Sequence, residues 1–301
     1  MVRGEKMKRR TKGQKIFTAC NGIFLTLFGF VTLYPFWYVL VASFNTGRDF
    51  LKGGVYFWPR DFTLQNYEMA FKDERIMPSL FISVSRTLLG TVLGILVTAI
   101  LAYALSVKSL PGKTGITFLF YFTTLFSGGM IPYYLQLRTL GLTSSFWLYI
   151  FPGIYSFFNF ILMRTNFSTI PEELRESAQL DGAGDIRILF QIYLPISTAV
   201  LATLALLIGV GHWNDWFTGA YYQSVQSLKP ASTVLQQLLA EATANQTVKV
   251  GQETALGSMT SYTSQSLQMA FVMILTMPIV VVYPFLQKYY VKGMVVGSVK
   301  G

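Results

Sequence analysis

Long apolar segments separated by polar ones set the pattern of this chain. The predicted membrane-spanning segments are residues 16–44, 78–106, 115–126, 146–163, 190–222 and 267–286. A helix rises about 1.5 Å per residue, so about 20 apolar residues cross the hydrocarbon core of a bilayer. A helix also satisfies its own backbone N–H and C=O groups, which lipid cannot do. The pattern therefore predicts an all-α polytopic membrane protein with six transmembrane helices.

The composition agrees with this prediction. Charged residues make up 13% of the 301 residues, against about 25% in soluble domains, and the mean hydropathy is +0.45. The formal net charge of +10 would by itself also fit a nucleic-acid-binding protein. The single cysteine, Cys20, lies in the first apolar segment, where we expect a small buried hydrophobe without a disulfide partner.

The distribution of Lys and Arg favours a membrane over nucleic acid. Residues 1–15 carry seven of these basic residues and one acid, directly before the first apolar segment. With the N-terminus inside, internal segments hold 15 of the 24 basic residues and external segments hold 8. Cytoplasmic loops carry such an excess in membrane proteins. We therefore predict an N-in and C-in topology, with a basic N-terminal tail that lies at the lipid surface.

The predicted domains follow from this topology. Residues 16–77 contain the first transmembrane helix and a polar external loop. Residues 78–286 contain a core of five helices, with a cytoplasmic loop at 171–195 and a long external loop at 223–266. Residues 1–15 form a basic cytoplasmic tail before these two membrane regions. Residues 287–301 form a cytoplasmic tail after them.

The cytoplasmic loop at 171–195 is the longest polar run between apolar segments. It carries five of the fourteen acids, so it lies outside hydrocarbon. Thr169 and Glu172 have the spacing of a capping box, which predicts the start of a helix. Gly182 can turn the backbone without steric penalty, and Asp185 can cap a second helix. We predict a helix, a glycine bend and a second helix at the membrane surface.

Within this loop, a series of residues resembles the EAA loop of permease subunits of bacterial ABC importers: Glu176-Ser177-Ala178, Asp181-Gly182-Ala183, Phe190 and Leu194-Pro195. Ser177 departs from the pattern, since the family more often has alanine there. The resemblance implies a coupling helix seated in a cleft of a separate ATPase subunit. The residues expected at this contact are Glu173, Leu174, Glu176, Ser177, Ala178, Asp181, Gly182 and Ala183. The alternative is an ordinary amphipathic cytoplasmic loop.

Three further stretches resemble carbohydrate permeases of the same superfamily. Residues 62–71 resemble a segment that often precedes the transporter core of sugar permeases. Residues 126–147 resemble the branch associated with complex oligosaccharides, and residues 287–301 resemble the ending of the smaller permease subunit in maltose-type systems. The resemblance implies the transmembrane domain of a type I ABC importer.

Two features interrupt the apolar segments. Arg86 lies about eight residues from the outer end of its helix, so it either snorkels to the surface or faces the transport path as a buried charge. The pair Gly128 and Gly129, followed by Pro132, predicts one of two structures. The helix is either broken here, next to protein or a water-filled cavity, or it is only kinked.

The outer half of the fifth apolar segment mixes aromatic, amide and ionisable side chains. They are His212, Trp213, Asn214, Asp215 and Trp216. Aromatic faces can stack on sugar rings, while amides and carboxylates can bond sugar hydroxyls. A Trp-Asn pair here also resembles sugar permeases. We expect these residues and the Gly128-Gly129 break to line the substrate path. The alternatives are hydrogen bonds between helices and an interfacial aromatic belt.

Catalytic motifs are absent from the sequence. It has no GxxxxGK[ST] loop, so the chain would have to draw on ATP bound elsewhere. One histidine and one cysteine are too few for a zinc-protease helix or a Cys-rich cluster. We therefore predict no catalytic residue, metal or cofactor in this chain, with ATP and Mg bound by a partner ATPase.

The sequence thus predicts a non-enzymatic permease subunit of an ATP-driven ABC importer for a sugar or oligosaccharide in the bacterial cytoplasmic membrane. The resemblance implies a second homologous permease, two ATPase copies and an extracytoplasmic solute-binding protein as partners. An ion-coupled secondary transporter or channel is the main alternative, although it usually needs ionisable groups near the membrane midplane. A non-transporting scaffold or sensor is a further alternative.

Overall fold

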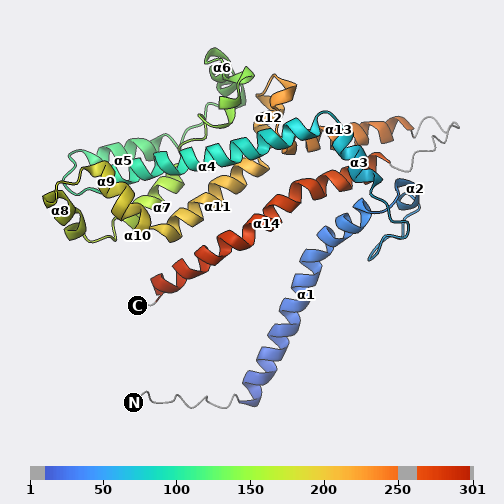
Figure 1. The fold of residues 1–301 in the computed structure, drawn as a ribbon, viewed down its shortest axis with the longest axis horizontal. Helices are drawn as coiled ribbons and strands as arrows, with labels where there is room; N and C mark the ends of the chain where they lie inside the picture. The colour runs from blue at the N-terminus through green and yellow to red at the C-terminus, as the bar shows by residue number, and fades with distance from the viewer. Residues whose placement is uncertain (1–10, 250–262, 299–301) are drawn as a thin grey trace. The chain divides into compact units, whose positions relative to one another are not determined.

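The structure of the protein is a computed structural model that describes residues 11–249 and 263–298. In these ranges the regular elements are helices, apart from one β-bridge between Asn45 and Phe62 (Figure 1). The α-helices are α1 (Lys12–Ser43), α2 (Gly47–Phe50), α3 (Gln65–Lys72), α4 (Ile76–Ser106), α5 (Lys113–Phe122), α6 (Met130–Thr139), α7 (Phe157–Phe167), α8 (Glu172–Leu180), α9 (Asp185–Ile188), α10 (Leu194–Ile196), α11 (Thr198–Asn214), α12 (Phe217–Tyr221), α13 (Ala231–Lys249) and α14 (Ser264–Ser298). Short 3-10 turns lie at Leu142–Ser144, Phe146–Tyr149 and Gln226–Leu228, and a π-helical turn lies at Leu189–Tyr193.

Three of the described helices are long and apolar enough to cross a membrane. They are α1, α4 and the Gln265–Pro284 part of α14. The helices from Asp185–Ile196 and Thr198–Tyr221 pass the same test only as a pair, bent by 87°. The helical class of the prediction is therefore confirmed, while the count of six spans stays a prediction. Cys20, expected to be buried, is exposed on α1, so that expectation is wrong.

Two of the predicted helices are interrupted. The one expected at 146–163 is a 3-10 turn followed by irregular chain, and α7 begins only at Phe157. Pro152 and Gly153 explain the interruption, because proline disfavours helix at its own position and at the residue before it. The helix expected at 190–222 bends between α10 and α11, and α11 ends at Asn214.

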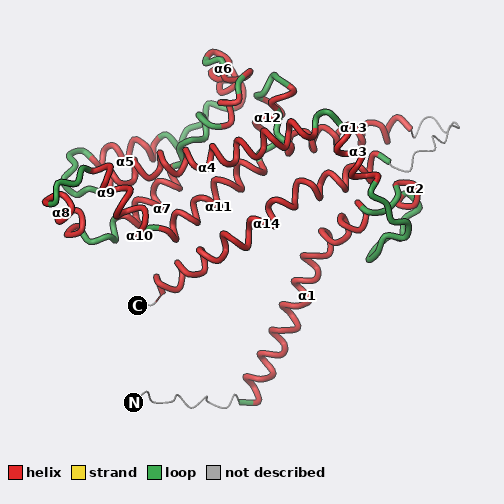
Figure 2. The backbone as a smooth tube through the Cα atoms, in the orientation of Figure 1, coloured by secondary structure: helices red, strands yellow, loops and turns green. Residues whose placement is uncertain are grey.

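The predicted break at Gly128 and Gly129 is confirmed. Helix α5 ends at Phe122 and α6 begins at Met130, with irregular chain between them (Figure 2). The loop expected at 223–266 contains α13, and residues 250–262 of that loop lie outside the described part. The tail expected at 287–301 is helical as far as Ser298. Residues 1–10 of the predicted basic tail and residues 299–301 lie outside the described part.

The chain forms two compact units. The first holds residues 11–69 and 263–273 of the described ranges, and the second holds 70–249 and 274–298. In the second unit, α4 packs along both α7 and α11 (Figure 1). Its core contains Phe160, Met163, Phe167, Ile188 and Leu204, each at most 1% exposed. Gly90 of α4 lies directly against the His212 ring of α11, so a side chain at position 90 would displace this ring.

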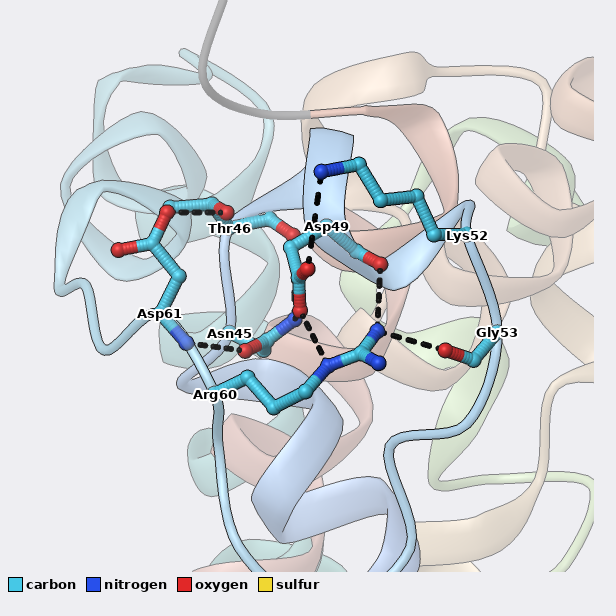
Figure 3. A network of polar contacts seen from close by, with 7 residues as sticks. All are labelled: Asn45, Thr46, Asp49, Lys52, Gly53, Arg60 and Asp61. Carbon is cyan, nitrogen blue, oxygen red and sulfur yellow. Dashed lines mark hydrogen bonds and ion pairs between the residues drawn. The ribbon is translucent and has the colours of Figure 1, made fainter.

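In the first unit, the polar loop after α1 is held by a network of side chains (Figure 3). Arg60 donates from Nε to Asp49 Oδ2 at 3.0 Å and from Nη2 to the carbonyl of Gly53 at 2.6 Å. Asn45 donates from Nδ2 to the same Asp49 oxygen at 3.0 Å and accepts the backbone N–H of Asp61 at 3.0 Å. The predicted external loop is therefore folded around one carboxylate.

We expect this loop to loosen in acid. The hydrogen bond from Asn45, together with Arg60, lowers the pKa of Asp49. A carboxylate with a lowered pKa stabilises the folded state above its ordinary pKa of about 4, and this contribution is lost as the pH falls toward the lowered value. Amide hydrogen exchange over residues 45–61, corrected for intrinsic rates, should show protection falling below about pH 4. The Asp49→Asn variant should lack this pH dependence, and equal acid sensitivity in both proteins would contradict the assignment.

Candidate functional site

The first candidate site is α8 with the bend that follows it. The predicted capping box does not form. Thr169 instead donates its hydroxyl to the carbonyl of Asn166 at 2.7 Å, and Pro171 is the N-cap residue. The hydroxyl is therefore used to close the end of α7. Helix α8 still begins at the expected place, because the extended backbone of Pro171 directs the chain away from α7.

Gly182 ends α8 in the conformation that the sequence predicts. Its φ is +80°, a left-handed value that is costly for residues with a Cβ atom. The Ala183 N–H bonds the carbonyl of Ala178 at 2.9 Å, and the Gly182 N–H bonds that of Gln179 at 3.0 Å. These two bonds form a Schellman motif, with glycine at its left-handed position. The glycine therefore fixes the direction in which the chain leaves α8.

One side of α8 packs on the protein and the other is exposed. Ala178 and Ala183 are half-buried and pack against the core of the second unit. The other predicted coupling residues, Glu173, Leu174, Glu176, Ser177, Asp181 and Gly182, are exposed. Leu180 and Ile186, which the sequence analysis did not single out, are 90% and 77% exposed. The exposed surface of the α8 segment is thus acidic with isolated large apolar side chains.

Polar contacts attach this segment to the end of α4. Lys108 Nζ lies 2.8 Å from Glu172 Oε2, and this hydrogen bond lowers the pKa of Glu172 and raises that of Lys108. Tyr103 donates to Asp185 Oδ1 at 2.8 Å, and Arg175 lies 3.5 Å from the same oxygen. The predicted cap by Asp185 is therefore wrong by one residue. Gly184 is the N-cap of α9, and the Asp185 carboxylate is used by Tyr103 and Arg175.

The second candidate site is the end of α11, where the structure separates the five predicted path residues. Trp213 is buried, and its indole N–H donates to the carbonyl of Leu275 at 3.1 Å. His212 is half-buried against Gly90. Asn214 and Trp216 are exposed. Trp213 therefore makes a hydrogen bond between helices, which was the alternative to sugar contact, while Asn214 and Trp216 remain accessible to a ligand.

Asp215 forms an ion pair that sequence reasoning missed. Its carboxylate, 34% exposed, lies 3.6 Å from Nη1 of Arg86, which is fully buried. Nη2 of Arg86 donates to the backbone carbonyl of Asp215 and to Ser232 Oγ at 3.1 Å. The guanidinium also lies over the Tyr149 ring, 5.1 Å from its centroid, within the range of a cation–π contact. Arg86 thus joins α4 to the end of α11 and the start of α13, and the snorkelling alternative is wrong.

Gly128 and Gly129 are exposed in the irregular chain before α6. Tyr133 of α6 and Tyr222, which the sequence analysis did not select, connect this region with the end of α12 because their rings lie 5.3 Å apart. Among the described residues, no group of three His, Cys, Asp or Glu side chains could hold a metal ion.

Comparisons with known proteins cover almost the whole chain, although no family model matches it. Protein LplC of Bacillus subtilis is 36% identical over 293 residues, which cover 97% of each chain. The polygalacturonan/rhamnogalacturonan transport system permease protein YtcP of the same organism is 36% identical, over 92% of this chain and 96% of the relative. The arabinooligosaccharides transport system permease protein AraQ of Halalkalibacterium halodurans is 26% identical, over 98% and 100%.

Two solved structures have a similar fold. A chain of a bacterial ABC transporter that imports the acidic polysaccharide alginate has a TM-score of 0.82 and 28% identity, over 94% of this chain and 100% of that chain. A chain of a bacterial alginate ABC transporter in complex with its pentasaccharide-bound periplasmic protein has a TM-score of 0.58. At 15% identity, over 90% and 93% of the two chains, it supports the fold alone.

Proposed function

Because this chain belongs to the carbohydrate ABC transporter permeases, we propose that segment 171–195 couples it to a separate ATPase subunit. As a permease of this family, the protein is a membrane protein that transports sugars or oligosaccharides. The proposal adds the direction of transport, which is import across the bacterial cytoplasmic membrane. It also adds the type I importer topology, with six spans and both termini inside.

The observation that supports the coupling proposal is that α8 is attached at both ends and exposed between them. The helix is held at both ends, by Lys108 on Glu172 and by the Schellman turn at Gly182. Between these points its outer surface is exposed, including Glu173, Glu176 and Ser177. A short helix that is held rigidly and carries charges is suited to transmit a rigid-body movement from a partner. Leu180, exposed outside an apolar segment, would add an apolar contact on the same partner.

The assembly we propose contains this chain, a second homologous permease, two ATPase copies and an extracytoplasmic binding protein. ATP and Mg would be bound by the ATPase copies, and this chain would hold no cofactor and catalyse no reaction. The cargo we propose is an oligosaccharide. Polygalacturonan and alginate, named for YtcP and for the solved importer, are both polymers of acidic sugars, so uronate oligomers are the first to be tested.

An ion-coupled secondary transporter would need an ionisable group free to change its charge. The candidates in this chain are Arg86, His212 and Asp215. Arg86 and Asp215 are paired with each other, and His212 is half-buried against Gly90. This pairing favours the ATP-driven alternative.

Cross-linking from α8 tests the proposed coupling. In a Cys20→Ser background, Ser177→Cys in the co-purified transporter is labelled with a cysteine-reactive photo-cross-linker. We expect an adduct with the ATPase subunit, because Ser177 lies on the exposed side of α8. Leu140→Cys, also exposed at 61% directly after α6, is the control and should give no such adduct. Adducts of the ATPase with position 140 but not with position 177 would contradict the proposal.

A further inference from the structure

A group of aromatic side chains lies where α6 and α12 meet. Tyr222 is 8% exposed and forms the centre of the group. Its ring lies 5.3 Å from that of Tyr133 and 5.6 Å from that of Phe217. Two more rings lie next to Phe217, that of Tyr221 at 4.5 Å and that of Trp216 at 6.0 Å. Residues about 85 positions apart in sequence thus form one aromatic surface.

The outer rings of this surface are open while its centre is buried. Tyr133 is 44% exposed, Trp216 37%, Phe217 39% and Tyr221 53%. We infer that these four residues, the α6–α12 aromatic surface, stack the pyranose rings of the transported oligosaccharide. This inference rests on the proposed import of oligosaccharides. It assigns sugar contact mainly to residues that the sequence analysis did not select, with Trp216 the exception.

The chemistry of the surface fits sugar rings. Aromatic faces carry partial negative charge and attract the C–H groups of a pyranose ring. Several adjacent rings can hold successive sugars of a chain, whereas a single ring would serve a monosaccharide. The exposed amide of Asn214 and the half-exposed carboxylate of Asp215 lie next to Trp216 in the chain and can bond sugar hydroxyls. Arg86 offsets the charge of Asp215, so a uronate sugar would not meet an unpaired acid here.

The backbone around the surface argues against lipid contact. The chain before α6 is irregular at 123–129, and it is irregular again after Tyr222. The backbone of Asp215, by contrast, is paired, because its N–H bonds the carbonyl of Gly211 and its carbonyl accepts from Arg86. Unpaired backbone groups do not face hydrocarbon, and such segments occur where protein or water covers them. Part of this backbone is covered by protein, since the Ser224 N–H bonds the carbonyl of Thr143 and Gln223 bonds that of Ser145. Irregular backbone next to the rings therefore needs protein or water beside it, and the inference places water and the sugar there.

Sugar import per ATP hydrolysed tests the inference in the co-purified transporter in proteoliposomes. The probe is whichever labelled pentasaccharide the wild-type complex imports fastest from a panel of galacturonate, mannuronate and neutral chains. Tyr133→Leu and Phe217→Leu keep apolar bulk but remove the ring. We expect each to lower import per ATP at least threefold at saturating loaded binding protein, because each removes one of the rings on which a sugar would stack. Tyr133→Phe, which keeps the ring, should lose clearly less import than Tyr133→Leu.

The controls separate stacking from folding and from coupling. Stimulated ATP hydrolysis should stay unchanged in all these variants, because α8 is untouched. Phe158→Leu, which removes an aromatic ring 68% exposed on α7, should import like the wild type. Wild-type import by Tyr133→Leu and Phe217→Leu would overturn the inference alone. Failure of the wild-type complex to import any chain of the panel would overturn the proposed function, and the inference with it.

Discussion

Replacing Gly182 by leucine, or Glu176 by alanine, is expected to abolish binding-protein-stimulated ATP hydrolysis and sugar import while the membrane part stays folded. A Cβ atom at the left-handed φ of +80° costs about 1–2 kcal/mol, so the chain would leave α8 in another direction. Glu176 is exposed and makes no hydrogen bond or ion pair within the described part of the chain. Its loss would therefore affect a partner rather than this subunit.

Gly184→Ala is the matched control for the glycine variant. Gly184 lies two residues further on, has an ordinary φ of −74°, and a Cβ atom there would meet nothing within 4 Å. Stimulated hydrolysis and import should be retained in this variant. Both activities are measured in proteoliposomes that contain the co-purified complex. Full stimulation in Gly182→Leu, with the complex assembled, would mean that the bend has no part in coupling.

Neutralising Asp215 as asparagine is expected to destabilise the protein by about 3 kcal/mol, on the order of 10 °C in the thermal midpoint. The amide still accepts the N–H of Thr218, which now bonds Asp215 Oδ1 at 3.1 Å, so the change removes charge and little else. Arg86 would then be a fully buried cation without a counter-charge. Breaking a buried pair from one side leaves such a charge uncompensated, which is the costly case.

A double-mutant cycle isolates the pair. Arg86→Met removes the buried cation, and the combined Arg86→Met/Asp215→Asn variant should be clearly more stable than the sum of the two single losses predicts. Asp181→Asn, an exposed acid at the end of α8, serves as the control and should leave the midpoint unchanged. Additive losses in the cycle, or equal midpoints for Asp215→Asn and Asp181→Asn, would show that the ion pair contributes little.

The sequence predicted the features that depend on local pattern. Long apolar runs identified α1, α4 and α14, because length and hydropathy suffice to define such helices. The left-handed turn at Gly182 was also predictable, since glycine between two polar helical stretches has few other purposes.

Features that depend on distant partners were not predictable. Arg86 looked like a snorkelling residue because nothing near it in sequence indicates Asp215 and Ser232, which lie 129 and 146 positions away. Trp213 is the kind of residue that often contacts sugars, but its indole N–H donates a hydrogen bond to a backbone carbonyl of α14. The 87° bend between α10 and α11 lies beside Pro195, a kink signal that gives neither the size nor the direction of the bend without its packing partners.

The central claim is that this permease imports an oligosaccharide only when a separate ATPase drives it through α8. The most direct measurement is uptake of a labelled pentasaccharide into proteoliposomes that contain the co-purified complex, loaded binding protein outside and ATP inside. We expect uptake that needs the ATPase and internal ATP and that persists when a protonophore and a sodium ionophore dissipate ion gradients. Uptake by this chain alone, driven by an ion gradient without ATP and unaffected by Glu176→Ala, would contradict the account.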